Sequence, residues 1–491
     1  MERSNKRILS LFLILVVLLS SLPFSASASG VRFAAETAVS ASDSEDTSDS
    51  DYISVNEDEM IISGGDIISE SSVSAADIGK VAATVALLVD VDSGRILYEQ
   101  DAHKQRPPAS TTKIMTALLV LEAVERGEIS LDKKIKVKRN LAEGVMYDAS
   151  HVSPRIKWNE ILTLEQLLYC VMIESDCACC EIVGAEVAGS VEKFVELMNE
   201  RAQEIGCKDT VFVNAHGYPA KGHTSTAWDL YLIAREAMKN ETFRKIVSTR
   251  VYTVPKTNLV SHKRTLYNSN WLLGMPPKSQ LKVKYDQNYK YDNCIGVKTG
   301  YSSEAGTCLV SYAEKNGRTL CCVVMGTWGV KLKNGTTRRQ SFTESKRLFE
   351  WGFDNFYYQT FLSGKTRFDD IPLPGGVSGV SLVPVSDTSV LVRNDEHLNI
   401  SASLDSGVCA PVSAGDVIGT LDISYENGEP AASVRLYAAG DVAAIPPDIP
   451  EPQNGIAAIF KGHETLLLGG NLAFMAVAIV ILFAKRAKRI K

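Results

Sequence analysis

Hydrophobic and polar positions change their period several times along the 491-residue chain, which divides it into segments. Residues 81–91 have a strand-like pattern, 92–94 a turn and 95–99 a second strand, so a hairpin is predicted. Residues 110–126 are apolar almost all round a helical period, as a helix buried within a domain is. Further helices are predicted after it, at 164–173, 180–187, 191–205 and 227–239.

Strand patterns return in the second half of the chain. Residues 294–298, 306–313 and 319–326 are apolar and β-prone, and Asn316-Gly317 is a strong hairpin signal between the last two. Because strands at both ends enclose a helical middle, we expect an α+β fold over residues 79–358. Its centre would be one antiparallel sheet covered by helices.

A different texture follows, in which short alternating segments are separated by Gly and Asp turns and no helical period is present. It predicts a small all-β domain over residues 361–445. Four prolines between residues 446 and 452 then indicate a stiff linker over 446–463. The segments that carry the β pattern most clearly are 388–392, 398–402 and 417–423.

The two ends of the chain predict export and a membrane anchor. Residues 1–28 combine three basic residues, an apolar run and the small-residue site Ala26-Ser27-Ala28, which is typical of a cleaved signal peptide; an uncleaved anchor is the alternative. Residues 29–78 are acidic and Ser-rich, which favours a disordered leader. Residues 464–484 predict one transmembrane helix, with the basic tail 485–491 in the cytoplasm and the bulk of the chain outside the cell.

Charge and cysteine content narrow the function classes. A net charge of −6 argues against a nucleic-acid partner. Cys177-x-x-Cys180 has no second pair at matching spacing, so it indicates a zinc site only weakly, and neither a metal nor a cofactor is expected. The clustered cysteines lie in apolar surroundings, where small buried side chains are the favoured role. They are Cys177, Cys179, Cys180, Cys321 and Cys322.

Three short motifs carry candidate chemistry. Ser110 and Lys113 are three residues apart on a predicted helix, so the amine can reach the hydroxyl and serve as its base. Ser175-Asp176-Cys177 lies between two predicted helices, where Ser175 could relay a proton or cap a helix. Lys298-Thr299-Gly300 closes a predicted strand and offers a second cation, a hydroxyl donor and room for close backbone approach. Each motif alone is only weak evidence of a catalytic site.

The order of the three motifs resembles that of penicillin-binding proteins and class A β-lactamases. The surrounding residues are similar to those of low-molecular-mass penicillin-binding proteins, the serine-type D-alanyl-D-alanine carboxypeptidases, over residues 80–445. The similar segments are Pro107–Thr116, Asn214–Gly217, Ser225–Leu230 and Gly296–Tyr301.

This resemblance implies the penicillin-binding transpeptidase fold and assigns a role to each motif. Ser110 would attack the bond between two D-alanines of a peptidoglycan stem peptide, with Lys113 as general base and Ser175 as proton relay. Lys298 and Thr299 would hold the terminal carboxylate, and Lys298 would also favour the neutral amine of Lys113. The backbone N–H groups of Ser110 and Tyr301 would stabilise the oxyanion. Gly300 would belong to the same substrate strand, and β-lactams would be covalent inhibitors.

Cys177 is a departure from the family pattern, which most often has Asn there to bind the substrate backbone. It leaves open a weakly active or inactive wall-binding homologue, and transpeptidase or endopeptidase activity stays open too. A class A β-lactamase is disfavoured, because no convincing Glu-x-x-Leu-Asn segment stands between Cys177 and Lys298. His216 is either a wall of the peptide site or a turn residue bonded to local backbone.

Overall fold

The computed structural model describes residues 52–54, 78–146 and 148–446. The predicted signal peptide, the linker beyond residue 446, the predicted membrane helix and the basic tail lie outside the described residues, as does the predicted leader apart from 52–54 and 78. Among the helices in the described ranges, none combines the length and apolar composition needed to span a bilayer.

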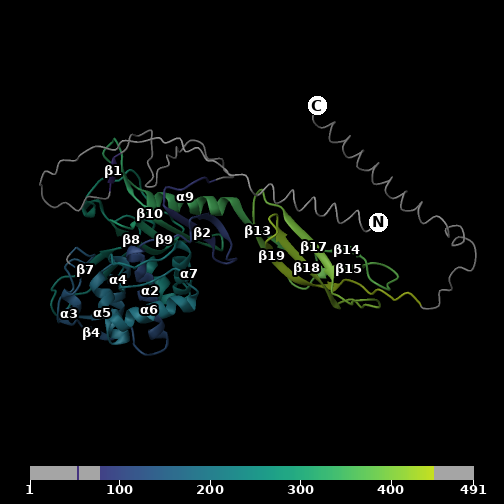
Figure 1. Cartoon of the computed structure of the whole chain (residues 1–491), viewed down its shortest axis with the longest axis horizontal. Coiled ribbons are helices and arrows are strands. Elements are labelled where there is room, and N and C mark those ends of the chain that lie inside the picture. The colour runs from purple at the N-terminus through teal and green to yellow at the C-terminus, as the bar shows by residue number, and fades with distance from the viewer. Residues whose placement is uncertain (1–51, 55–77, 147, 447–491) are drawn as a thin grey trace, which may run out of the picture. The chain divides into compact units, whose positions relative to one another are not determined.

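A five-stranded antiparallel sheet forms the centre of the first folded region, with the strand order β3-β2-β10-β9-β8 (Figure 1). The predicted hairpin at its N-terminal end is confirmed, although its first strand begins later than expected. The predicted turn at Asn316-Gly317 is also confirmed, since both residues have positive φ, 54° and 76°, as a tight hairpin requires. The strands are β2 (Val85–Asp90), β3 (Ile96–Gln100), β8 (Cys294–Ser302), β9 (Gly306–Lys315) and β10 (Arg318–Thr327).

Helices cover both faces of this sheet, which explains why its central strands are buried at nearly every position. Val85, Leu87 and Val89 of β2 face the larger core, whereas Ala86 and Leu88 face a second core under α9 (Gln340–Asn355) (Figure 1). The neighbouring cysteines of β10 follow the same alternation: Cys321 lies in the first core and Cys322 in the second.

The larger core is built from the helical middle of the chain. Helix α2 (Lys113–Glu125) is buried almost all round, as its pattern predicts, but Ser110 precedes it in a separate 3₁₀ turn, η1 (Ala109–Thr112). The other helices are α3 (Arg139–Glu143), α4 (Leu164–Ile173), α5 (Cys177–Ala188), α6 (Val191–Ile205), α7 (Ala227–Ala237) and α8 (Glu241–Ser248). Two further 3₁₀ turns are η2 (Trp271–Leu273) and η3 (Lys278–Gln280).

Two further predictions of local structure were wrong. Helix α5 begins at Cys177, three residues before the predicted start, because Asp176 caps it by accepting a hydrogen bond from the Cys179 N–H at 2.8 Å. Lys298-Thr299-Gly300 lies inside β8 and does not close it, since pairing with β9 continues to Ser302.

Short two- and three-stranded pairings complete the region. Residues 52–54, expected to be unstructured, form β1 (Tyr52–Ser54) and pair in parallel with β11 (Gly329–Lys331), whose backbone has an open edge there. The other short strands are β4 (Lys134–Lys136), β5 (Ile161–Thr163), β6 (Val251–Val254), β7 (Arg264–Tyr267) and β12 (Thr337–Arg339).

The second folded region is all-β, as predicted. Its main sheet has the order β14-β15-β19-β18-β17, and β13 pairs with β16 beside it. Inward side chains such as Val380, Leu421 and Leu436 form a separate core. The strands are β13 (Phe356–Phe361), β14 (Phe368–Ile371), β15 (Val380–Pro384), β16 (Thr388–Arg393), β17 (Leu398–Leu404), β18 (Val417–Tyr425) and β19 (Pro430–Ala438).

Candidate active site

Two glycines hold the turn that carries Ser110 against its surroundings. A Cβ on Gly217, whose φ is +83°, would lie 1.8 Å from the carbonyl oxygen of Ala109. A Cβ on Gly300 of β8 would lie 3.0 Å from the Ser110 backbone nitrogen. Only glycine permits such close backbone contacts, so the Ser110 turn is clamped between the loop at Gly217 and strand β8.

Lys113 joins the first two motifs. Its side chain is fully buried, and Nζ lies 2.9 Å from Ser110 Oγ and 3.4 Å from Cys177 Sγ. A third hydrogen bond, at 2.6 Å, goes to the backbone carbonyl of His216. The amine is therefore surrounded by three partners, one of which is the hydroxyl that needs a base.

The segment Ser175-Asp176-Cys177 forms the tight connection between α4 and α5. Ser175 has a φ of +64°, and its buried hydroxyl has no hydrogen-bond partner among the described residues. Asp176 is fully buried: besides capping α5, it accepts a hydrogen bond from the Val152 N–H at 2.7 Å. The Asp176 carboxylate therefore fixes the conformation of the segment, whereas the Ser175 hydroxyl makes no hydrogen bond within the described residues.

Lys298 and Thr299 bring the third motif to the same place from the edge strand β8. Burial, followed by the positive charge of the nearby Lys113, lowers the pKa of Lys298 to about 7. Lys298 Nζ donates to the Thr299 carbonyl at 3.0 Å, and the Thr299 hydroxyl donates to Ser269 Oγ at 2.7 Å. Tyr301, two positions further along β8, is 40% exposed.

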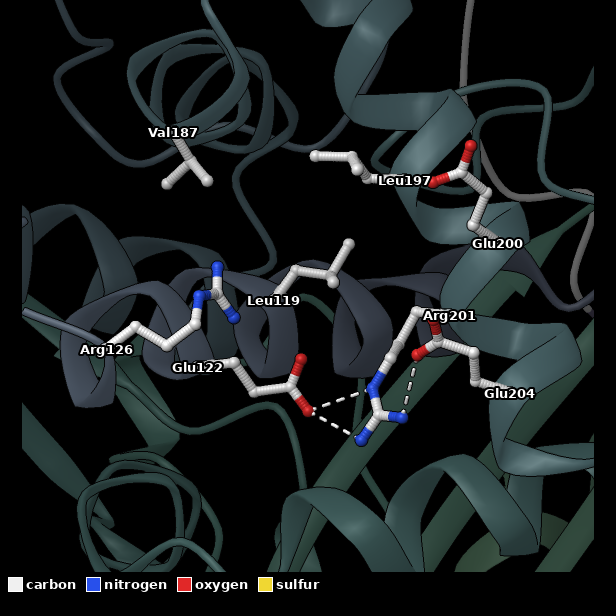
Figure 2. A pocket seen from close by; sticks show the side chains of 8 residues that line it. All are labelled: Leu119, Glu122, Arg126, Val187, Leu197, Glu200, Arg201 and Glu204. Atoms are coloured by element: carbon white, nitrogen blue, oxygen red, sulfur yellow. Dashed lines mark hydrogen bonds and ion pairs between the residues drawn. The ribbon is translucent and has the colours of Figure 1, made fainter. Parts of the chain in front are cut away.

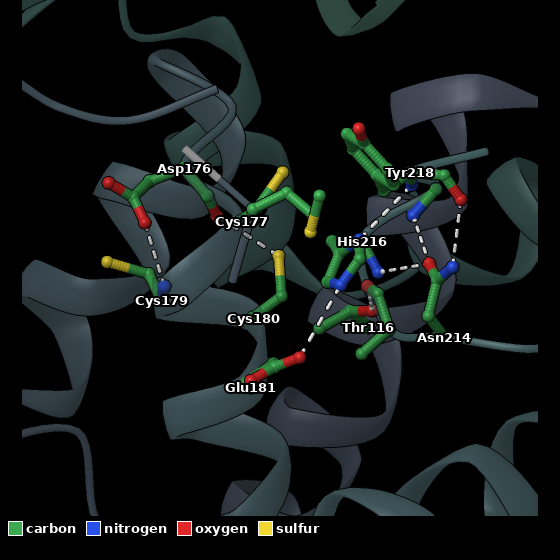
Figure 3. Close-up of polar contacts among 12 residues, drawn as sticks. Thr116, Asp176, Cys177, Cys179, Cys180, Glu181, Asn214, His216 and Tyr218 are labelled. Carbon is green, nitrogen blue, oxygen red and sulfur yellow. Dashed lines mark hydrogen bonds and ion pairs between the residues drawn. The ribbon is translucent and has the colours of Figure 1, made fainter. Parts of the chain in front are cut away.

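A loop that is tied to itself by hydrogen bonds carries His216 (Figure 3), and the His216 backbone carbonyl accepts a hydrogen bond from Lys113 Nζ. Its Nδ1 accepts the Tyr218 N–H at 3.1 Å, and its Nε2 lies 3.5 Å from a carboxylate oxygen of Glu181. Burial lowers the pKa of His216, the Glu181 carboxylate opposes that effect, and the Lys113 charge adds to it. Of the two interpretations of His216, these contacts favour the turn residue bonded to local backbone, and the ring has a second partner on α5.

The structure adds four residues to this site that had no role assigned from the sequence. Ser269 meets Thr299, Glu181 meets His216, and Gly217 meets the Ser110 turn. Glu174 is the fourth: burial raises its pKa, the Tyr267 N–H and the charge of Lys298 oppose that rise, and the Tyr267 N–H donates to it at 2.8 Å. Only Gly217 carried a local signal, as part of Asn-Ala-His-Gly.

The clustered cysteines lie in the core, as predicted. All five are at most 3% exposed, and no cysteine of the described residues is in a disulfide. Cys179, Cys180 and Cys321 pack in the larger core and Cys322 in the smaller one. Burial raises the pKa of the Cys180 thiol, which keeps it protonated.

A separate hollow of about 400 Å³ lies between α2, α5 and α6 and contains none of the motif residues (Figure 2). Three of its charged groups pair with each other: Arg201 contacts Glu122 at 2.9 Å and Glu204 at 3.1 Å. Ser110, Lys113 and Lys298, by contrast, bring a hydroxyl and two amines together, and such an arrangement can support acyl transfer.

Comparison with known proteins agrees with this chemistry. The family described as D-alanyl-D-alanine carboxypeptidase matches residues 70–329, and the C-terminal domain of penicillin-binding protein 5 matches residues 359–444. D-alanyl-D-alanine carboxypeptidase DacF of Bacillus subtilis is 27% identical over 361 residues, covering 73% of this chain and 85% of the relative. DacC of Escherichia coli is 29% identical over 354 residues, covering 70% and 80%.

A solved structure matches most of the chain. Penicillin-binding protein 5 of Haemophilus influenzae superimposes with a TM-score of 0.54 at 26% identity, covering 74% of this chain and 98% of that one. The predicted fold class is thereby confirmed for the transpeptidase-like region and the all-β domain. The chain belongs to the D-alanyl-D-alanine carboxypeptidase family of serine peptidases.

Proposed function

We propose that this chain removes the terminal D-alanine from peptidoglycan stem peptides through an acyl-enzyme on Ser110. The observation that carries the proposal is the 2.9 Å separation of Lys113 Nζ from Ser110 Oγ, with the lysine fully buried. At this distance the neutral amine of Lys113 can accept the hydroxyl proton directly.

Acylation would proceed in two steps. Ser110 Oγ attacks the carbonyl carbon of the penultimate D-alanine and passes its proton to Lys113 Nζ. The oxyanion is held by the backbone N–H groups of Ser110 and Tyr301. The C–N bond then breaks, and the proton returns through Ser175 to the amine of the departing D-alanine. Water hydrolyses the ester and regenerates the hydroxyl.

The remaining motif residues would hold the substrate. Lys298 supplies a positive charge, and Thr299 a hydroxyl, to the C-terminal carboxylate of the peptide. Gly300 and Tyr301 lie next to them on the edge strand, where an extended peptide can add to β8. Cys177 takes the place beside Lys113 from which a side chain reaches the substrate backbone. β-Lactams acylate the same hydroxyl.

The architecture we propose puts this reaction at the outer face of the cell membrane. Residues 1–28 direct export, 29–78 form a leader, and the catalytic domain spans 79–358. The β domain at 361–445 and the linker at 446–463 lead to a transmembrane helix at 464–484 and a basic cytoplasmic tail at 485–491. The apolar and basic patterns of these end segments support the assignment.

Labelling with a fluorescent penicillin tests the proposed nucleophile. The wild-type protein should form a covalent adduct, and Ser110→Ala should form none. Equal, weak labelling of both proteins, with both still binding peptidoglycan, would instead favour a wall-binding role. Cross-linked products from peptide donors and amine acceptors would indicate a D,D-transpeptidase, and cleavage of existing cross-links an endopeptidase.

A further inference from the structure

The His216 carbonyl is the strongest acceptor around Lys113. A neutral amine has one lone pair and two N–H groups. When the lone pair faces Ser110 Oγ at 2.9 Å, the N–H groups point to the His216 carbonyl at 2.6 Å and to Cys177 Sγ at 3.4 Å. A thiol sulfur is a weak acceptor, so the carbonyl sets the direction of the amine.

The loop that carries this carbonyl is braced from within by Asn214. Its side-chain oxygen accepts hydrogen bonds from the N–H groups of His216, at 3.2 Å, and Gly217, at 2.7 Å. Its amide nitrogen donates to the Tyr218 carbonyl at 2.9 Å. These bonds shape the turn, but none of them ties it to α5, the helix that presents Cys177.

The His216 ring makes that connection (Figure 3). Because Nδ1 accepts the Tyr218 N–H, the ring proton of the neutral imidazole is assigned to Nε2, which faces Glu181. Glu181 is four residues after Cys177 on α5, so both side chains leave the same face of the helix. Cys177 contacts Lys113 directly. Glu181 contacts the ring of His216, and the backbone carbonyl of His216 contacts Lys113.

We propose that Glu181 and His216 form a positioning pair that aims the Lys113 amine at Ser110. This inference rests on the proposed function, since it explains how the Lys113 amine, the proposed general base, is oriented toward Ser110. The Glu181 carboxylate orients the His216 ring, and the ring fixes the turn through its bond to the Tyr218 N–H. The turn in turn positions the His216 carbonyl that Lys113 contacts. Neither residue contacts the reacting atoms.

The first test compares three variants of the full-length protein by rapid-quench labelling with a fluorescent penicillin. Glu181→Ala should lower the acylation rate constant by about 10-fold, because small misplacements of catalytic groups have large effects, with penicillin affinity unchanged. Glu181→Gln keeps an oxygen that can accept the Nε2–H bond and should stay within threefold of wild type. The matched control is Glu186→Ala, because Glu186 lies on the same helix but pairs with Lys133 at 2.6 Å.

Two kinetic outcomes would overturn the proposal. One is acylation by Glu181→Ala at the wild-type rate. The other is an equal loss in Glu181→Ala and Glu186→Ala, which would indicate a general effect on α5. A further pair of variants separates the two ring contacts: His216→Asn can keep the bond to Tyr218 only, and His216→Gln can reach Glu181 only. If the pair positions Lys113, His216→Gln should retain more activity than His216→Asn.

An NMR measurement tests the pair without any reaction. In ¹⁵N-histidine-labelled protein, His216 should be a neutral Nε2–H tautomer at pH 7, and Glu181→Ala should lower its pKa, because the carboxylate favours the charged ring. Lys113 and His151 also act on this ring, and both are unchanged in the variant. A proton on Nδ1 would contradict the pair even if the enzyme is active. Failure of the proposed function would appear separately, as absent Ser110 labelling in wild type.

Discussion

Lys298 offers the clearest link between the proposed chemistry and stability. Its ammonium is 1% exposed, and burial, followed by the nearby charge of Lys113, lowers its pKa from 10.5 to about 7. At about 1.36 kcal/mol per pKa unit, this difference amounts to about 5 kcal/mol against folding at pH values below 7. The buried charge of Lys298 therefore lowers the stability of the folded protein. Lys298→Met should make the protein more stable, but the variant should not bind the C-terminal carboxylate of the peptide.

The measured increase in the free energy of unfolding of Lys298→Met should be smaller than this upper limit, because the wild-type Nζ also donates a hydrogen bond at 3.0 Å to the Thr299 carbonyl. Replacing buried charges by apolar side chains of similar volume typically stabilises proteins by about 1–4 kcal/mol. We expect a gain in this range at pH 6.5 for Lys298→Met, together with loss of penicillin acylation.

The pH dependence follows from the sign of the shift. Between pH 7 and 10.5 the unfolded chain keeps a proton on Lys298 that the folded protein has released, so wild-type stability rises with pH. The advantage of Lys298→Met should therefore be full below pH 7 and shrink above it. Urea unfolding at pH 6.5 and 9.5 measures both values, and the exposed Lys290→Met is the control. A variant less stable than wild type at pH 6.5, or an advantage that does not change with pH, would refute the argument.

Three further substitutions test individual contacts of the site. Cys177→Asn should preserve or increase the acylation rate, because an amide oxygen is a better acceptor for Lys113 than sulfur; a folded variant that cannot be acylated would contradict the assigned position. Gly217→Ala should cost about 3 kcal/mol or more in urea unfolding, since its Cβ would meet the Ala109 carbonyl, whereas Gly222→Ala, with a φ of +85° and open space, should cost only about 1–2 kcal/mol. Ser175→Ala removes a hydroxyl without a partner, so unfolding should be unchanged while acylation slows by about 100-fold; a stability loss without slower acylation would show a structural role instead.

Local patterns were sufficient to predict the elements on which the motifs lie. The Asn316-Gly317 turn, the apolar strands of the central sheet and the buried helix after Ser110 each have a short-range signal. The sequence pattern predicts too late a start for α5, because it assigns Asp176 to a loop. Its side chain is in fact the cap of that helix. The amphipathic helix α9 was not predicted, and it begins at Gln340 without a side-chain cap.

The chemistry of the site depends on contacts that the sequence pattern does not contain. Glu181 and His216 are 35 positions apart, and only the packing of α5 against the 214–218 loop brings them together. Thr299 and Ser269 meet in the same way, across 30 positions. The motif residues were found because the family order of three motifs identified them. Their supporting partners could be found only from the folded structure.

The central claim is hydrolysis of a D-alanyl-D-alanine bond through Ser110, and a defined substrate tests it most directly. Incubation of the purified protein with a stem pentapeptide, followed by mass spectrometry, should show loss of one D-alanine and a transient ester on Ser110. Ser110→Ala should leave the peptide unchanged. An unaltered pentapeptide with wild type, or equal D-alanine release by both proteins, would contradict the account.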